Sequence, residues 1–308
     1  MKKNLILVLL LTQALITFAG GGQETGDKLS GTISIAGSST VYPISVAVAE
    51  EFSKMHPDVS IPVQSTGTGG GFKNFYIPGK TDINDASRPM KDSERVAAEA
   101  NGIKTIEIQV ATDGITVVVN PDADWLDNIT VKQLNMIWRA DNPAKKWSDV
   151  DPSWPNQEIE LYGPTAASGT FDYFTEVING EEGLSRSDYQ GTEQDNTIVQ
   201  AISGSKYAMG YFGMAYYLEN KDKVKALKIE GISPSIETAK SGVYKPLARP
   251  IFIYVSSKAL ARPEVVEYVK FYINQTDTNL IKEIGYVPLN TSEKDKMMNK
   301  LDTFLGNL

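Results

Sequence analysis

The chain has 308 residues, a formal net charge of −8, no cysteine and a single histidine. This length is sufficient for a large hydrophobic core and favours two domains. The lack of cysteine excludes disulfides, thiolate zinc sites and a lipid-modified N-terminal cysteine, and with one histidine we expect no metal site and no cofactor. The acidic balance argues against nucleic-acid binding, because phosphate backbones are bound by clustered lysine and arginine.

The first segment has the pattern of a secretory signal peptide. Two lysines precede an apolar run from Leu5 to Leu15, and the small residue Ala19 follows. This pattern predicts a signal peptide over residues 1–19, too short to serve as a spanning helix. Its removal takes away two lysines and no acids, so the net charge would change from −8 to −10. We expect the mature protein to be periplasmic or extracellular.

Strand-like and helix-like patterns alternate along the rest of the chain. Strands are expected at 32–37, 59–65, the start of 81–90, 104–110, 113–121, 158–163, 208–213 and 249–256. Helices are expected at 43–57, 91–102, 130–141, 171–180, 195–204, 262–275 and 278–285. The N-cap of the helix at 195–204 would be Asp195 or Asn196. Such regular alternation predicts an α/β fold with mainly parallel sheets. The apolar strands near 114–119 and 250–255 are suited to crossing between two domains built from interleaved segments.

Four turns share one character, since each follows a strand-like segment, leads into a helix and carries hydroxyls or glycines. They are "GSST" (37–40), "STGTGGG" (65–71), "SR" (87–88) and "ASGT" (167–170). In open α/β sheets, ligands bind beyond the carboxyl ends of strands, where helix N-termini favour an oxyanion. Hydroxyls and a glycine-rich backbone can add donors, and Arg88 offers a planar cationic group. Each turn alone is most often a simple helix cap, but four together favour an anion site.

The sequence offers little support for catalysis. An exported phosphatase or esterase using Ser39 or Ser168 would need a base within reach. The single histidine, His56, stands before Pro57 at a helix end, where a surface position is the expected one. No Walker loop, dinucleotide motif or paired-carboxylate spacing is present. We therefore expect a protein that is not an enzyme.

Five segments in this order resemble the periplasmic phosphate-binding proteins of phosphate ABC transporters (PstS-type). They are "AGSSTVYPIS" (36–45), "STGTGGGFKNF" (65–75), "TDINDASRPM" (81–90), "SGTFDYFTEVI" (168–178) and "SGVYKPLARPIFIYV" (241–255). The resemblance implies a type II periplasmic-binding-protein fold, with two interleaved α/β domains and a ligand cleft between them. Domain I would comprise 28–112 and 250–308, and domain II would comprise 113–249.

The resemblance also implies which residues would bind phosphate. By position these are Ser39, Thr40, Val41, Thr68, Ser87, Arg88, Ser168, Gly169 and Thr170, with Ser38 and Asp195 as weaker candidates. The hydroxyls of the first turn are expected both to cap the following helix and to donate to the anion. The first three turns would belong to one domain and the last to the other, so that domain closure would bury the anion. The expected partners are inorganic phosphate and an inner-membrane ABC permease complex, with the binding protein itself a monomer.

Two departures from the best-known branch of this family affect selectivity. A carboxylate stands there at the position of Ser87 and accepts the proton of hydrogen phosphate, which helps reject sulfate. An arginine stands there shortly before the S-G-T turn, where this chain has Pro164 and Thr165. Arg88 could replace the guanidinium, and Asp85 or Asp195 could replace the acceptor. A binding protein for another oxyanion, such as sulfate or molybdate, therefore remains an alternative, ahead of the phosphatase or esterase.

Overall fold

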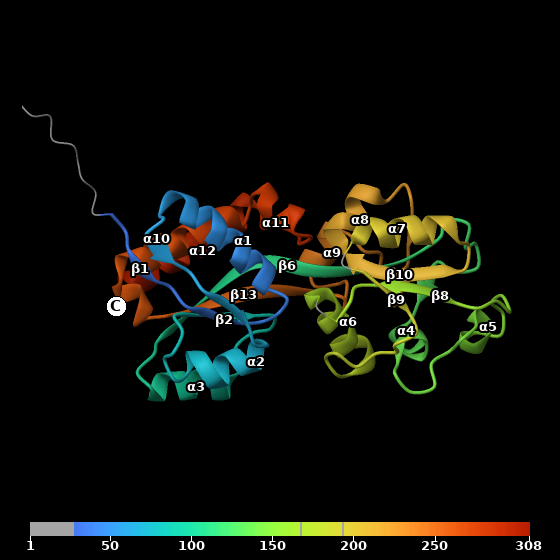
Figure 1. Ribbon diagram of the computed structural model, residues 1–308, viewed down its shortest axis with the longest axis horizontal. Helices are drawn as coiled ribbons and strands as arrows, with labels where there is room; N and C mark the ends of the chain where they lie inside the picture. The colour runs from blue at the N-terminus through green and yellow to red at the C-terminus, as the bar shows by residue number, and fades with distance from the viewer. Residues whose placement is uncertain (1–27, 167, 193) are drawn as a thin grey trace, which may run out of the picture.

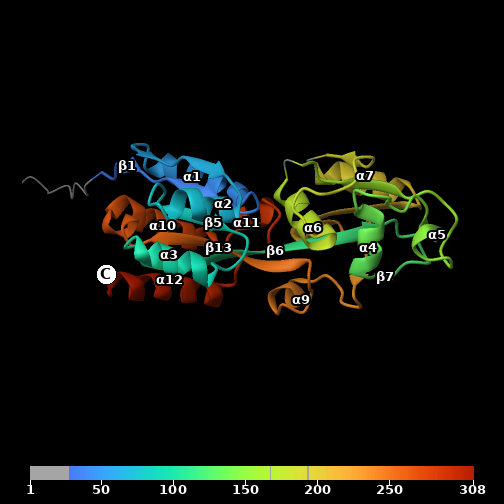
Figure 2. The same cartoon turned by 90° about the horizontal axis from the view of Figure 1, so that it is seen from below.

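Two lobes lie side by side and are joined by a pair of long strands (Figures 1 and 2). The computed structural model describes residues 28–166, 168–192 and 194–308, so the predicted signal peptide lies outside the described residues. We call the lobe that carries the first described residues and the C-terminus the first lobe, and the other the second lobe. The predicted domain boundaries, at 112/113 and 249/250, fall inside the two joining strands.

One continuous sheet runs through both lobes in the strand order β4-β2-β5-β13-β6-β10-β8-β9, with β11 also paired to β6. Its strands are β2 (Ile35–Gly37), β4 (Val63–Ser65), β5 (Ile83–Ala86), β6 (Thr105–Val119), β8 (Glu160–Gly163), β9 (Gln190–Gly191), β10 (Ala208–Gly213), β11 (Lys225–Ala226) and β13 (Ala248–Ser256). Two small ribbons pair β1 (Gly31–Thr32) with β3 (Val59–Ser60) and β7 (Asn128–Ile129) with β12 (Lys228–Ile229).

The strands β6 and β13 cross between the lobes. β6 has 15 residues and is therefore about 50 Å long at the usual rise of a strand. It is buried without interruption from Val110 to Val119, because both of its faces are covered there. β6 and β13 are antiparallel to each other and to their neighbours β10 and β5, whereas the strands within each lobe are parallel. The strand pairings are thus mainly parallel, as expected, and are antiparallel at the crossing, where the chain enters the second lobe on β6 and returns on β13.

Helices cover the sheet in each lobe. The first lobe has α1 (Tyr42–Met55), α2 (Thr68–Gly71), η1 (Phe72–Tyr76), α3 (Asp92–Ala100), η2 (Ala259–Ala261), α10 (Pro263–Gln275), α11 (Asn279–Glu283) and α12 (Thr291–Leu305). The second lobe has α4 (Val131–Trp138), α5 (Trp147–Val150), α6 (Gly169–Asn179), α7 (Asp195–Gly204), α8 (Met214–Asn220) and α9 (Ile236–Lys240). The predicted helices are present, but the N-cap of α7 is Gln194 and Asp195 is its first helical residue. No helix in the described part of the chain combines the length and hydrophobicity needed to cross a membrane.

Each lobe has its own hydrophobic core. The apolar spacing of α1 predicts an inner face of Ile44, Ala47, Val48, Phe52 and Met55; Ile44, Val48 and Phe52 are buried, whereas Ala47 is half-buried and Met55 is exposed. The Phe52 ring packs edge-on against Tyr268 of α10 with centroids 5.2 Å apart. In the second lobe Phe174 of α6 stacks on Tyr211 of β10 at 3.7 Å, and Trp138 packs edge-on against Tyr211. These cores fix α1 and α6 against the sheet, and the N-terminal ends of both helices therefore have defined positions.

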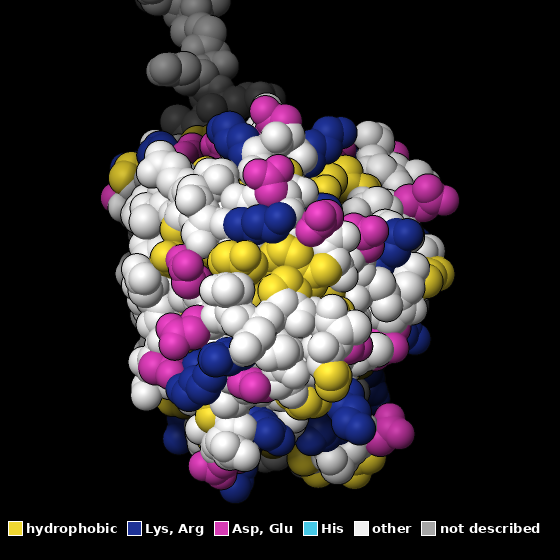
Figure 3. Space-filling view, turned by 90° about the vertical axis from the view of Figure 1, so that its right-hand side faces the viewer, with side chains coloured by type: hydrophobic (Ala, Val, Ile, Leu, Met, Phe, Trp, Pro, Cys, Tyr) yellow, Lys and Arg dark blue, Asp and Glu magenta, His cyan; other side chains and the backbone are white. Residues whose placement is uncertain are grey.

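Positive and negative side chains are mixed on the visible surface of the second lobe's outer end. Figure 3 shows lysines and arginines among aspartates and glutamates there, around a central hydrophobic group. That face shows no broad patch of a single charge sign. An anion would therefore be recognised by local groups and not by a field from this end of the molecule.

Candidate functional site: a polar pocket between the lobes

A small polar pocket, which we call the cleft pocket, lies where the two lobes meet, with an empty volume of ≈ 210 Å³. It is lined by Ser38, Ser39, Thr40, Gly67, Thr68, Ser87, Asp172, Tyr173, Glu176, Glu182 and Arg249. The structure therefore brings together residues of the first three predicted turns, which follow β2, β4 and β5. Strands β4, β2 and β5 are parallel neighbours, so their carboxyl ends share one edge of the sheet.

The first turn contributes hydroxyls that do not cap the helix after it. The N-cap of α1 is the buried residue Val41, and no side chain accepts a hydrogen bond from the first turn of α1. Ser38 Oγ instead accepts from the Thr40 amide within the turn, at 3.1 Å. The backbone carbonyl of Thr40 accepts from the Tyr286 hydroxyl at 2.6 Å. The predicted capping role is wrong, and these hydroxyls are placed toward the pocket.

The second and third turns are bonded to each other. Thr68 Oγ1 lies 3.1 Å from Ser87 Oγ and accepts from the Ser87 amide at 3.1 Å. The glycine at position 71 is required by packing, since a Cβ there would lie 2.7 Å from the Cα of Gly37. This close approach holds α2 against β2 and fixes Thr68 beside Ser87.

The fourth turn meets the first across the interface between the lobes. Ser168 caps α6 by accepting from the Thr170 amide at 3.2 Å. The carbonyl of Gly169 accepts from Thr40 Oγ1 at 3.4 Å, and a Cβ on Gly169 would lie only 2.6 Å from the Thr40 Cα. Only glycine permits this contact. Ser39 Oγ also donates to Asp172 Oδ2 of α6 at 2.5 Å, so the lobes touch on both sides of Thr40.

The guanidinium of the cleft pocket belongs to Arg249, a residue that sequence reasoning missed. It stands near the start of β13, its side chain is 17% exposed, and its Nη2 donates to Thr40 Oγ1 at 3.3 Å. Its Nη1 donates to Glu176 Oε2 at 3.2 Å, and the guanidinium lies 3.6 Å from the ring centre of Tyr173. The only signal in the sequence is an arginine at the edge of an otherwise apolar crossing strand.

Arg88 does not line the cleft pocket. Its guanidinium donates two hydrogen bonds to Glu94, at 2.9 and 2.8 Å, and it faces a different pocket on the first lobe. The prediction that Arg88 supplies the pocket's guanidinium is therefore wrong in this structure. Glu94, in the first turn of α3, is well placed to hold it because it also accepts from the Lys91 amide.

The carboxylates of the cleft pocket come from the second lobe. Asp172 and Glu176 extend from α6, and Glu182 lies in the segment after it. Partial burial, together with the negative charges of Asp172 and Glu176, raises the pKa of Glu182. Asp113, paired with Arg249 on the neighbouring strand, is buried; burial raises its pKa to about 6, although Arg249 opposes the shift.

The two carboxylates expected from the sequence to accept the proton of hydrogen phosphate, Asp85 and Asp195, lie outside the cleft pocket. Asp85 is fully buried beneath the site, where its Oδ1 accepts from Ser45 Oγ at 2.9 Å. Burial raises the pKa of Asp85 to about 8, with the Ser45 hydrogen bond acting in the opposite direction. Asp195 begins α7 and is not among the residues that line the cleft pocket. Neither residue occupies the acceptor position in this structure.

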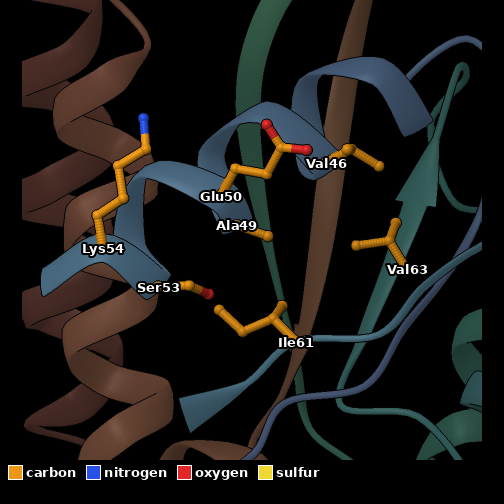
Figure 4. A pocket seen from close by; sticks show the side chains of 7 residues that line it. All are labelled: Val46, Ala49, Glu50, Ser53, Lys54, Ile61 and Val63. Atoms are coloured by element: carbon orange, nitrogen blue, oxygen red, sulfur yellow. The ribbon is translucent and has the colours of Figure 1, made fainter. Parts of the chain in front are cut away.

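A larger groove on the first lobe lies away from these turns. Figure 4 shows it between the outer face of α1 and the chain at Ile61 and Val63. Its charged side chains are Glu50 and Lys54, and Lys54 pairs with Glu51 at 2.6 Å. The groove has no hydroxyl turn or guanidinium, so it does not have the chemistry of an oxyanion site. Among the described residues, no group of three or more His, Cys, Asp or Glu side chains could hold a metal ion.

Several known proteins are similar in sequence to this chain over most of its length. A family model described as a PBP superfamily domain matches residues 22–276. Protein SphX of Synechocystis is 44% identical over 272 residues, covering 86% of this chain and 80% of the relative. The phosphate-binding protein PstS of Staphylococcus saprophyticus is 36% identical over 293 residues, covering 93% and 89%.

A solved structure extends this similarity to three dimensions. The crystal structure of a possible phosphate binding protein from Planctomyces limnophilus is 47% identical and superposes with a TM-score of 0.86. The match covers 89% of this chain and 99% of that one. The expected type II periplasmic-binding-protein fold is confirmed. The chain therefore belongs to the PBP superfamily and, within it, to the PstS-type phosphate-binding proteins.

Proposed function

We propose that this chain binds inorganic phosphate in the cleft pocket, outside the cytoplasm and as a monomer, and delivers it to an ABC-type permease. The observation that carries this proposal is the convergence of three hydroxyl-bearing turns and one guanidinium on a small pocket between two lobes. A guanidinium and hydroxyls are the donors that a phosphate group prefers. The placement between lobes suits a ligand that is enclosed when the lobes close and released when they open.

The donors would come from both sides of the pocket. Thr40, Thr68 and Ser39 would donate hydroxyl hydrogens from the first lobe, and Ser87 would support Thr68. Arg249 would provide the charge-assisted hydrogen bonds from the crossing strand. Val41, Ser168, Gly169 and Thr170 would act through backbone groups and through the contact that brings the lobes together.

Asp172 is our proposal for the acceptor that favours hydrogen phosphate over sulfate. It lines the pocket and accepts from Ser39, whereas Glu176 is engaged by Arg249. Hydrogen phosphate can donate its proton to such a carboxylate. Sulfate has no proton to donate and would leave two negative groups facing each other in a partly buried site.

Binding without turnover is the expected behaviour. His56 lies at the C-terminal end of α1, which has 14 residues, so about 20 Å of helix separates it from Ser39 at the other end. This histidine cannot act as the base for a Ser39 nucleophile. Calorimetric titration with phosphate, arsenate and sulfate tests the proposal. We expect one phosphate bound per chain and no heat of binding with sulfate. The absence of a binding heat with phosphate would contradict the proposal.

A further inference from the structure

A second pocket with cationic walls adjoins the cleft pocket on the first lobe. We call it the rim pocket; it has an empty volume of ≈ 770 Å³ and is open to solvent. It is lined by Gly69, Lys73, Ile77, Arg88, Lys91, Ser93, Glu94 and Ala97. None of these residues lines the cleft pocket.

The two pockets share a wall of two peptide units. Thr68 and Ser87 line the cleft pocket, and the next residues in the chain, Gly69 and Arg88, line the rim pocket. Neighbouring Cα atoms are about 3.8 Å apart, so the rim pocket begins within one residue of the cleft pocket. Gly69 and Arg88 also face each other, because a Cβ on Gly69 would lie 3.6 Å from Arg88 Nη2.

The rim pocket has an excess of positive charge. Three cationic side chains, those of Lys73, Arg88 and Lys91, face one carboxylate, Glu94. Glu94 is already bound to Arg88, and neither Lys73 nor Lys91 forms an ion pair with any residue that the structure describes. Both lysines are exposed. Their charges are therefore free to attract an anion from solvent.

This local charge has the opposite sign to the chain as a whole, whose net charge is −8. At physiological ionic strength the Debye length is about 8 Å, so distant acidic groups are largely screened while charges beside the path of the ligand are not. A phosphate dianion close to the cleft would consequently respond to the rim lysines more than to the overall negative field. Charged walls of this kind raise the rate at which an ionic ligand arrives.

We infer that Lys73, Arg88 and Lys91 form a second anion subsite at the rim, which captures inorganic phosphate from solvent and speeds its entry into the cleft pocket. This inference rests on the proposed function. Arg88 is fixed by Glu94 and by its position 5.9 Å from the ring centre of Phe72, so it forms the rigid wall of the subsite. The two exposed lysines supply the positive charge that is not held in an ion pair among the described residues.

Stopped-flow fluorescence with inorganic phosphate tests this inference. In the variant Lys73→Gln/Lys91→Gln we expect phosphate association to slow by roughly three- to tenfold at low salt. The difference should shrink at high salt, and the dissociation rate should stay unchanged. The control Lys80→Gln/Lys104→Gln removes two exposed lysines from the same lobe and the same amount of charge. This control variant should bind phosphate with the same association rate as the unaltered protein.

The outcomes separate the two claims. If the unaltered protein binds phosphate and both double variants associate equally fast, the rim subsite is overturned and the proposed function stands. A change confined to the dissociation rate would also overturn it, because the lysines would then act on bound phosphate. If the unaltered protein binds no phosphate, the proposed function fails and the inference fails with it.

Discussion

Ser39 Oγ donates a hydrogen bond to Asp172 Oδ2 at 2.5 Å, although 133 residues separate them along the chain. Ser39 lies in the first-lobe turn after β2, and Asp172 lies in the first turn of α6 in the second lobe. The contact therefore joins the two lobes at the cleft pocket itself. An oxyanion between these lobes would compete for the same donor, which links ligand binding to the interface.

The variant Asp172→Asn tests the acceptor directly. It keeps the size of the side chain but removes the negative charge, so sulfate no longer faces a negatively charged carboxylate. We expect the ratio of phosphate to sulfate affinity to fall by roughly tenfold or more, equivalent to about 1.4 kcal/mol. Competition titration measures this ratio. Asp195→Asn is the matched control; an equal change in both variants would refute the role of Asp172.

Replacing Arg249 by glutamine should remove the charge-assisted hydrogen bonds to the anion. Loss of such bonds weakens phosphate binding by roughly 1.5–3 kcal/mol, about 10- to 150-fold in Kd. Arg88→Gln should change the equilibrium affinity much less, because its guanidinium is bound to Glu94 outside the cleft pocket. Calorimetry of both variants distinguishes these residues. A larger loss in Arg88→Gln would restore the role first expected from the sequence.

Thr68→Ala should weaken phosphate binding by removing a hydroxyl donor and the partner of the Ser87 amide. A hydrogen bond to a charged group is worth roughly 1.5–3 kcal/mol. The variant Thr68→Ser keeps the hydroxyl and should retain most of the affinity. If both substitutions leave calorimetric affinity unchanged, the anion does not contact this turn.

Gly169→Ala should hinder the approach of the lobes. The added methyl would lie 2.6 Å from the Cα of Thr40, and overpacking of this kind costs about 1–3 kcal/mol. We expect weaker phosphate binding with little change in the thermal stability of either lobe. Gly204→Ala is the control, since a Cβ at that helical position would meet nothing within 4 Å. Unaltered affinity in Gly169→Ala would show that phosphate binds without this contact.

Stability should depend on pH through Asp85. Burial raises its pKa to about 8 in the folded chain, whereas an unfolded aspartate has a pKa near 3.9. The neutral form is thus favoured by folding, so the contribution to stability is complete below about pH 4 and is lost as the pH rises through about 8. Denaturant unfolding of Asp85→Asn should show a flatter profile between about pH 5 and about pH 8. An identical slope in both proteins would contradict this assignment.

The local elements were predictable from the sequence, but the contacts between distant residues were not. The apolar spacing of α1 and the strand-to-helix turns are local patterns, and the structure has the helix and, over the described residues, the turns where they are expected, although Met55 at the end of α1 is exposed. Arg249 pairs with Thr40 across 209 residues, and no local pattern indicates that pairing. The expectation for Arg88 is wrong because Glu94, six residues later, binds its guanidinium outside the cleft pocket.

The proposed function requires that phosphate lies in the cleft pocket between Thr40, Thr68 and Arg249. A crystal structure of the chain grown with phosphate tests it most directly. We predict one tetrahedral anion within hydrogen-bonding distance of the Thr40 and Thr68 hydroxyls and of the Arg249 guanidinium. An anion that touches neither Thr40 nor Arg249, or a cleft pocket without an anion, would contradict the claim.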